Sequence, residues 1–397
     1  LKPGTLFLKE VEENGIPVNI DILDNADEEI NKEMEPLLER LYSFEEIKIL
    51  EKQQGKLFNV NSPKQLQTLL FTIMGFPVTK KTDTGNPSAD AEVLEGLAQS
   101  HELPAIINKI KKLKSIKSKY LDKMKISIDR DGRIRTNFNL HTTTSGRLSS
   151  SGKLNAQQFP RDVKVVKKAI EAKEGFNIVS QDLKTAEMYV ASVLSGDKAL
   201  QKIFIDKQDY HGSMALQKFN LPCEANEVAE LFPNQRQAAK TISFEILYKL
   251  NYNEPALKNF STLKKWLKTQ EEFIKENGYI YSIFGRKRRV EDVHSPNRKE
   301  KMHQVRSAIN FLVQSVSSDI NLIAGINMQN WIKENGYAEK MRIFGLVHDS
   351  ILAEVADEVL DIYTAKLAEF TQADMGCSIP GHPIGLDLEI GNNYAFA

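Results

Sequence analysis

The chain has 397 residues, 41% of them hydrophobic and 27% charged, and its 53 basic residues balance 53 acidic ones. This composition indicates a globular protein of two or three domains and argues against a disordered or fibrous chain. Cys223 and Cys377 lie far apart, which argues against a disulfide framework or zinc site and fits a reducing compartment. We expect neither a signal peptide nor a membrane-spanning segment. The chain starts at Leu1 rather than Met, which predicts a fragment or a processed product.

Charge is distributed unevenly along the chain. Residues 1–51 contain 14 Asp or Glu and 5 Lys or Arg, a net charge of −9. Residues 105–125 contain eight Lys and one Asp, a net charge of +7. Because local charge governs the binding of a polyanion, the zero total does not exclude a nucleic-acid partner.

Helical patterns dominate the first third. Residues 1–51 are predicted to be helical with charged faces, and 58–76 to be a helix capped by Asn61 or Ser62 with Pro63 in its first turn. In 106–125 apolar residues recur at helical spacing, so one face packs and the lysines point outward. The lysines form either an ordinary solvated face or a surface for a phosphate backbone.

The middle of the chain changes to strand and loop patterns. Residues 126–139 alternate as two strands around an Asp-Gly turn. The polar, Gly- and Ser-rich segment 141–162 is too long for a plain turn, and long structured loops are often functional. From Gly175 onward the pattern predicts a buried strand, a helix, a long helix and finally a hairpin.

Two aspartates stand at predicted strand ends. Asp182 follows the apolar run 176–179 and precedes a helix, and Asp349 lies between two apolar runs in 342–355, at the turn of a predicted hairpin. Each has an ordinary structural explanation, a helix cap for Asp182 and a turn preference for Asp349. If the two converge, they can hold two divalent ions for an in-line displacement at phosphorus, and oxygen ligands favour Mg²⁺.

A helix predicted over 234–250 carries two cations and two rings in line. Arg236, Lys240, Phe244 and Tyr248 follow each other at intervals of four residues and line one broad face. The cations can hold a triphosphate, and the rings can stack on a sugar and a base. The alternative is an amphipathic helix whose rings make core contacts.

Seven segments in order resemble A-family DNA polymerases, the group of bacterial polymerase I and many phage enzymes. Segment 181–192 resembles the first palm motif (Asp-Tyr-Ser-Gln-Ile-Glu), 236–248 the fingers helix (Arg-x-x-x-Lys-x-x-x-Phe/Tyr-x-x-x-Tyr) and 347–351 the second palm carboxylate motif. Four further matches are 143–160 to the Thr-Gly-Arg-Leu-Ser-Ser element, 209–211 to Asp-x-His, 278–290 to the Gly-Tyr…Gly-Arg-Arg-Arg run and 306–320 to Arg-x-x-x-Asn-x-x-x-Gln.

The resemblance implies an α+β, right-hand polymerase fold with an antiparallel palm sheet, fingers and thumb. The implied divisions are a thumb over 1–130, palm over 131–205 and 296–397, and fingers over 206–295. No segment of this chain resembles the family's proofreading exonuclease.

The resemblance also implies a two-metal DNA polymerase that adds dNMP to a primer 3′-hydroxyl. Asp182 and Asp349 are expected to hold two Mg²⁺ ions, with Mn²⁺ as a substitute, and Lys240 to protonate the leaving pyrophosphate. Glu187, held by Tyr248, is expected to fill the space that a ribose 2′-hydroxyl needs. The residues expected to bind the dNTP are Arg236, Lys240, Phe244, Tyr248, His211 and Glu187. The residues expected to contact DNA are Arg147, Asn155, Gln157, Arg306, Asn310, Gln314, His348, Lys112 and Lys119, together with the basic run 286–289.

The implied partners are primer–template DNA, dNTPs and processivity or replisome proteins, with no membrane. The implied location is the cytoplasm of a bacterial or phage-infected cell, with an organelle as the alternative.

The chain departs from the family pattern at several positions, and two other functions remain as alternatives. Ser350 stands where relatives have Glu, Glu245 and Lys249 stand where they have Gly, and the fingers segment 249–260 looks short. A single-subunit RNA polymerase and a non-catalytic DNA-binding replisome scaffold are the alternative functions. Glu187 argues against the first, and retention of both aspartates argues against the second. A P-loop ATPase fails on glycine spacing.

Overall fold

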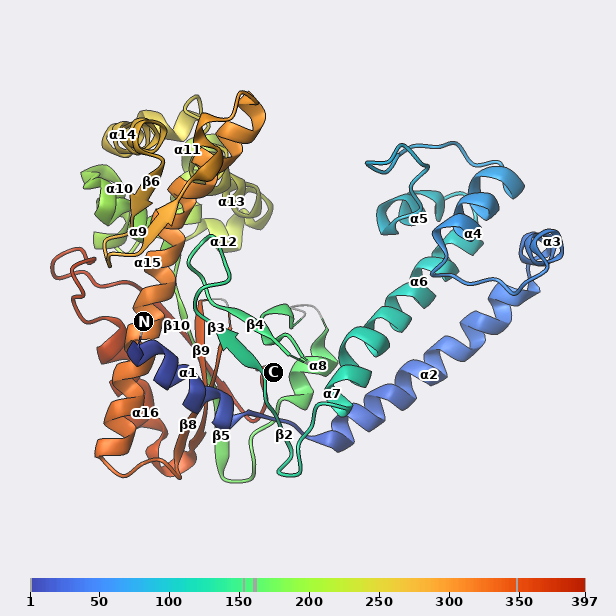
Figure 1. Ribbon diagram of the computed structural model, residues 1–397, viewed down its shortest axis with the longest axis horizontal. Coiled ribbons are helices and arrows are strands. Elements are labelled where there is room, and N and C mark those ends of the chain that lie inside the picture. Colours follow the sequence, from blue (N-terminus) through green and yellow to red (C-terminus); the bar gives the residue numbers. More distant parts are fainter. Residues whose placement is uncertain (1, 153, 160–162, 348, 397) are drawn as a thin grey trace. The chain divides into compact units, whose positions relative to one another are not determined.

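The computed structural model describes residues 2–396 apart from 153, 160–162 and 348, and the chain divides into two compact units. Unit 1 comprises Leu1–Pro17, Arg135–Gln158 and Glu171–Ala397, and unit 2 comprises Val18–Ile134 and Phe159–Ile170. Both helices and strands contribute (Figure 1). The expected α+β class is confirmed.

A four-stranded antiparallel sheet forms the centre of unit 1. Its strand order is β10–β5–β9–β8, with β5 flanked on both sides and buried along most of its length. The bounds are β5 (Phe176–Leu183), β8 (Met341–Val347), β9 (Ser350–Ala356) and β10 (Leu386–Gly391). In this register Asp182 pairs with Ser350 on β9, so Asp182 and the β8–β9 turn lie at the same end of the sheet.

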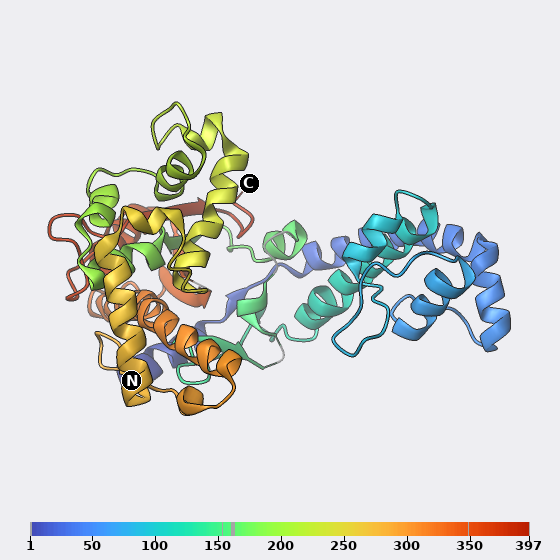
Figure 2. The ribbon, with the colours of Figure 1, turned by 90° about the horizontal axis from the view of Figure 1, so that it is seen from above.

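Long helices pack on this sheet. Helix α15 (Arg298–Glu334) contacts β8 and β9, α16 (Leu360–Thr371) packs on both α15 and β9, and α1 (Lys2–Asn14) lies against β8 and α15 (Figures 1 and 2). By length and composition alone α15 would also pass as a membrane-spanning helix. Its apolar window is 83% buried, which identifies α15 as a core helix.

A second group of helices in unit 1 lies between β5 and α15 in sequence. These are α9 (Ala186–Ser195), α10 (Lys198–Ile205), α11 (Tyr210–Phe219), α12 (Val228–Leu231), α13 (Pro233–Leu247) and α14 (Ser261–Asn277), with a 3₁₀ turn at Pro255–Lys258. Helix α13 packs on α11 and α12 through buried residues such as Ile242 and Ile246. One apolar cluster joins the helices of this group to α15. Helix α13 is therefore held against the core that carries Asp182.

Short elements complete unit 1. They are β1 (Ile16–Pro17), β3 (Asn137–Asn139), β4 (Ser149–Ser151), a 3₁₀ turn at Ala156–Gln158, the hairpin β6 (Tyr279–Tyr281) and β7 (Lys287–Arg289), and 3₁₀ turns at Glu291–His294 and Asp357–Val359. The predicted long loop 141–162 thus contains β4 and a 3₁₀ turn.

Unit 2 is mainly helical. It contains α2 (Ile20–Ser43), α3 (Glu45–Gln54), α4 (Pro63–Gln67), a π-helical turn at Thr68–Ile73, α5 (Ala91–Leu97), α6 (Glu102–Ile116), a second π-helical turn at Lys117–Leu121, α7 (Asp122–Lys125), β2 (Arg133–Ile134) and α8 (Lys164–Ala169). The predicted cap is confirmed, because Ser62 accepts a hydrogen bond from the Gln65 amide and Pro63 opens α4. Of the two strands predicted in 126–139, the first is reduced to a single bridge between Ile128 and Ile134.

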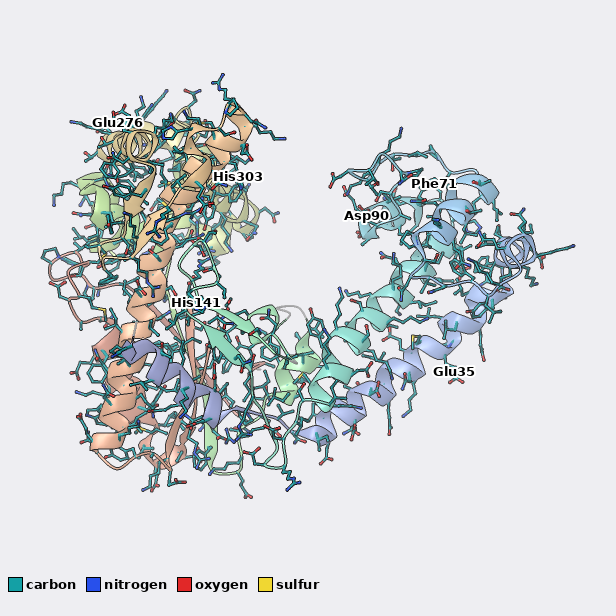
Figure 3. All side chains as sticks on the ribbon, viewed as in Figure 1. Glu35, Phe71, Asp90, His141, Glu276 and His303 are labelled. Atoms are coloured by element: carbon teal, nitrogen blue, oxygen red, sulfur yellow. The ribbon has the colours of Figure 1, made fainter. Side chains whose placement is uncertain are left out.

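The acidic and lysine-rich segments partly neutralise each other inside unit 2. Helices α2 and α6 are in contact. The Lys109 amine lies 2.8 Å from Glu33, Lys125 lies 2.7 Å from Asp24, and Lys117 pairs with Asp27. Other residues remain exposed, including Lys112 on α6 and Lys119 in the second π-helical turn. Glu35 on α2, labelled in Figure 3, is also exposed.

Candidate active site

The Asp182 carboxylate is partly buried at the end of β5, beside a second carboxylate. Its Oδ1 accepts a hydrogen bond from the Leu183 amide at 3.0 Å, and the Ser350 hydroxyl also hydrogen-bonds to it. Burial raises the pKa of Asp182, and the nearby charge of Asp349 raises it further. The serine that replaces the family's glutamate therefore contacts the first aspartate directly.

Asp349 lies at the β8–β9 turn, as predicted. Its backbone carbonyl accepts a 2.6 Å hydrogen bond from Asn321 on α15, which fixes the turn to the core helix. Its Oδ2 lies 3.4 Å from a guanidinium nitrogen of Arg147, while its Oδ1 is buried without a hydrogen-bond partner among the described residues. A buried carboxylate oxygen without a donor is costly unless a cation binds it.

This donor set fits a divalent cation. Among the residues that the structure describes, no group of three or more His, Cys, Asp or Glu side chains gathers at one point. Asp182 and Asp349 would therefore be the protein ligands, and substrate phosphates and water would complete the shell. Mg²⁺ commonly binds in this way, with one or two carboxylates and substrate oxygens.

Glu187, on the first turn of α9, is the centre of a polar cluster. The Tyr248 hydroxyl donates to its Oε1 at 2.6 Å, and Arg147 donates to the same oxygen at 2.9 Å. Gln314 on α15 hydrogen-bonds to the Tyr248 hydroxyl and lies 3.4 Å from Glu187. Burial and the Glu187 charge both raise the pKa of Tyr248, which keeps the phenol protonated as a donor. Three residues distant in sequence thus fix one carboxylate.

Helix α13 presents the cations and rings in line, as the spacing predicts. The Phe244 side chain is 48% exposed and stacks on Tyr248 with ring centroids 5.1 Å apart. Lys240 is exposed and forms no ion pair with any described residue. The alternative of a helix whose rings lie in the core does not hold for Phe244. At its C-terminal end Glu245 and Lys249 pair with each other at 2.6 Å.

Arg236 is held by a carboxylate that sequence reasoning did not single out. Both oxygens of Asp209 accept hydrogen bonds from the guanidinium of Arg236, which raises the pKa of Arg236. His211 lies next to this pair, its buried Nδ1 has no hydrogen-bond partner among the described residues, and burial lowers its pKa. The imidazole is therefore predominantly neutral at pH 7.

The remaining predicted DNA contacts divide by location. Asn155 and Gln157 lie around the 3₁₀ turn, where the Gln157 side chain donates to the Leu346 carbonyl at 2.6 Å and thereby joins this loop to β8. Arg306 and Asn310 lie on α15, and the buried Asn310 Oδ1 meets no hydrogen-bond partner in the part of the chain that the structure describes. Lys112 and Lys119 belong to unit 2 and are exposed. The predicted contact at 348 lies outside the described residues.

Gly146, which precedes Arg147, is required by both backbone and space. Its φ is +76°, and an added Cβ would lie 2.6 Å from the Ser315 Cβ. Gly146→Ala is expected to lower the free energy of unfolding by about 2–4 kcal/mol, from left-handed strain and overpacking together. Gly285 provides a matched control, since its φ is +79° but nothing lies within 4 Å of an added Cβ. Denaturant unfolding of both variants checks this, and equal losses would contradict the packing argument.

The sheet, its paired strand-end aspartates and the adjacent α13 define the right-hand fold of nucleic-acid polymerases. The profile of DNA polymerase family A matches residues 23–256 and 251–395, and the chain belongs to that family. The two matches meet where the fingers segment was expected to be short.

Known proteins agree with this membership. The DNA polymerase of Escherichia phage T5 is 41% identical over 98% of this chain and 50% of its own length. The thermostable DNA polymerase I of Thermus aquaticus is 28% identical over 98% of this chain and 47% of its own length. The POL domain of Pol1 from M. smegmatis, in complex with DNA primer-template and dNTP, superposes with a TM-score of 0.85 at 27% identity, covering 100% of this chain and 70% of that one. The chain spans about half the length of the curated relatives it matches.

Proposed function

We propose that the chain is a DNA-directed DNA polymerase that adds dNMP to a primer 3′-hydroxyl in the 5′-to-3′ direction. One observation carries the proposal: Asp182 lies beside Asp349, and Arg147 joins Asp349 to Glu187, whose carboxylate is also fixed by Tyr248 and Gln314. The family membership and the primer-template and dNTP bound to the M. smegmatis relative support it. The palm is assigned to the sheet, the fingers to 206–295 and the thumb to unit 2, whereas α1 of the predicted thumb region 1–130 packs in unit 1.

The side chains have distinct tasks in this proposal. Arg236, Lys240 and His211 hold the triphosphate, and Lys240 donates a proton to the leaving pyrophosphate. Two Mg²⁺ ions, or Mn²⁺ in their place, would be held by Asp182 and Asp349 and would supply charge stabilisation for phosphoryl transfer. Asp209 uses Nε and Nη2 of the Arg236 guanidinium, so Nη1 would donate to a phosphate oxygen while Asp209 holds the side chain in place.

Duplex DNA would lie along the loop 143–160 and α15. Arg147, Asn155, Gln157, Arg306, Asn310 and Gln314 are assigned to it, with Lys112 and Lys119 as phosphate contacts from unit 2. Minor-groove acceptors are nearly common to all base pairs, so these contacts would test pair geometry rather than read sequence. We place the activity in the cytoplasm of a bacterial or phage-infected cell, with replisome or processivity proteins as further partners.

Primer extension by the unmodified chain tests the function. A labelled primer on a longer DNA template, with Mg²⁺ and dNTPs, is expected to be extended to the template end, and rNTPs are expected to be used far less efficiently. Extension with rNTPs at rates that match dNTPs would assign the chain to RNA synthesis. Binding of DNA without any extension would favour the scaffold alternative.

Phe244→Tyr is expected to improve the use of dideoxynucleotides. The ring is stacked on Tyr248 and half exposed, so an added hydroxyl would extend toward the bound sugar and replace the missing 3′-hydroxyl contact. A hydrogen bond to a charged group corresponds to about a tenfold gain or more in relative kcat/KM. Single-nucleotide incorporation of ddNTP against dNTP measures it, and an unchanged ratio would contradict this position for the ring.

A further inference from the structure

The β6–β7 hairpin has an outward face made of two tyrosines and two cations. Its antiparallel register pairs Tyr279 with Arg289 and Tyr281 with Lys287. Residues two apart on a strand share a face, so these four side chains lie together on one side. Ile280 and Arg288 occupy the opposite side. We call Tyr279, Tyr281, Lys287 and Arg289 the hairpin platform.

The inward side fixes this hairpin to the rest of unit 1. Ile280 is buried, and β6 contacts both α14 and α15 (Figure 1). The Arg288 guanidinium donates to the Ser307 carbonyl at 2.6 Å and to the Thr144 carbonyl at 2.7 Å. Of the platform side chains, Tyr279 also packs edge-on against Phe273 of α14 with ring centroids 5.8 Å apart, so Tyr281 is the ring that remains open.

The platform is open and its cations have no carboxylate partners. The Tyr281 side chain is 50% exposed, and its ring centroid lies 5.6 Å from that of Tyr279 at a steep interplanar angle. The Lys287 amine lies 4.1 Å from the Tyr279 ring centroid and 5.4 Å from that of Tyr281. In the described part of the chain neither Lys287 nor Arg289 forms an ion pair.

A hollow of about 280 Å³ adjoins the platform. It is lined by Gly278, Tyr279, Lys287, Arg289, Val290 and Glu291. Glu291 is the single carboxylate in this lining, so the hollow retains a net positive charge. Exposed rings beside unpaired cations are what a strand of unstacked nucleotides requires, because rings stack on bases and cations hold phosphates. A duplex offers phosphates but keeps its base faces covered.

We propose that the hairpin platform binds single-stranded DNA, namely the unpaired template ahead of the primer end. The proposal rests on the proposed polymerase function. The position of the hairpin favours the template strand, because Arg288 joins it to Ser307 and Thr144. Ser307 adjoins Arg306, and Thr144 belongs to the loop of Arg147, both assigned to DNA. The inward side of the hairpin thus adjoins the surface assigned to the duplex, and a template strand that leaves the duplex would reach the platform by passing over the hairpin.

Binding measurements without dNTP test the platform separately from catalysis. Fluorescence anisotropy would compare one primer–template duplex carrying a 5′ template overhang of about ten nucleotides, within the usual span of single-strand sites, with the same duplex ending blunt. Tyr281→Ala is expected to lower affinity for the overhang substrate by about 5- to 150-fold, the range for loss of one stacked base, and to leave blunt-duplex affinity within about twofold. Tyr281→Phe, which keeps the ring, is expected to bind both like the unmodified chain.

Tyr337→Ala is the matched control, because Tyr337 follows the far end of α15 and stacks on Trp331 rather than on the platform. It is expected to change neither affinity. A double variant, Lys287→Gln with Arg289→Gln, removes only exposed charges. It tests the same proposal if Tyr281→Ala does not fold. It is expected to reduce the salt dependence of overhang binding, by about 0.7 in slope for each lost phosphate contact.

Two results would overturn the proposal. One is unchanged overhang affinity in both platform variants, which would leave the tyrosines as ordinary cross-strand packing. The other concerns a third substrate, in which a complementary strand covers the template overhang and carries a single-stranded flap. If the platform variants lost affinity only for this substrate, the platform would bind a displaced strand rather than the template. Failure of the polymerase proposal is distinguishable, since it would show as absent primer extension by the unmodified chain while overhang binding is measured independently.

Discussion

Asp182→Asn protein is expected to lose at least about 10³-fold in primer-extension rate while still binding primer–template DNA, because it loses charge needed to hold metal against the reacting phosphate. Single-turnover incorporation with saturating dNTP and Mg²⁺ measures the loss. Asp387→Asn is the matched control: Asp387 is the Cα partner of Asp182 on β10, but its side chain is 59% exposed and pairs with Lys184. This control is expected to stay within a few-fold of the unmodified rate. Normal extension by Asp182→Asn would refute the metal assignment.

The same substitution is expected to stabilise the metal-free protein at neutral pH. The folded-state pKa of Asp182 is raised by burial and by Asp349, so the folded chain holds a proton more tightly than the unfolded chain. The free energy of unfolding therefore falls as pH rises from the pKa of Asp182 in the unfolded chain to its pKa in the folded chain. This loss of stability persists at pH 7, where the carboxylate is charged. Asparagine cannot ionise, so the variant does not lose this stability. Thermal unfolding in a chelator should show a higher Tm for Asp182→Asn at pH 7, with the gap closing below the unfolded pKa.

Added Mg²⁺ should reverse this order. A ligand that binds only the folded state raises Tm, so the unmodified chain gains stability and Asp182→Asn gains little. If Mg²⁺ raised both Tm values equally, the ion would be binding elsewhere.

The sequence predicts local elements well where apolar residues form runs or side chains recur at helical spacing. The strand before Asp182 and the hairpin at Asp349 follow from apolar runs, and the face of α13 follows from the four-residue spacing of its cations and rings. Hydrogen bonds and ion pairs between residues far apart in sequence have no such signal in the sequence. Nothing near Arg236 in sequence indicates Asp209 as its partner, and nothing near Asp349 indicates Asn321 on α15.

The charge available to DNA was the hardest property to predict, because it also depends on contacts between residues far apart in sequence. The lysine-rich segment and the acidic segment look like separate surfaces in sequence, yet Lys109, Lys117 and Lys125 pair with carboxylates of α2. A formal charge of +7 therefore overstates the charge available to DNA. Only the packing of α2 on α6 distinguishes lysines that are neutralised from those, such as Lys112 and Lys119, that remain exposed.

Glu187→Ala is expected to reduce discrimination against rNTPs by about 10- to 100-fold, the range typical of steric selection against a small group. The carboxylate is held by Tyr248 at 2.6 Å and Arg147 at 2.9 Å, so it cannot swing aside for a 2′-hydroxyl. Alanine opens that space while leaving Asp182 and Asp349 unchanged. The ratio of kcat/KM for dNTP to that for rNTP measures the effect.

Tyr248→Phe tests how much the Tyr248 hydroxyl contributes by positioning the Glu187 carboxylate, which excludes the ribose 2′-hydroxyl. The variant keeps the carboxylate and the ring that stacks on Phe244, but loses the hydroxyl that joins Glu187 to Gln314. We expect a smaller loss of discrimination than for Glu187→Ala, and in the double variant no further loss beyond Glu187→Ala, because the hydroxyl acts only through the carboxylate. Additive losses would show that Tyr248 selects the sugar independently. Equal reductions of dNTP and rNTP use by Glu187→Ala would instead mean that Glu187 supports the fold of the site rather than its selectivity.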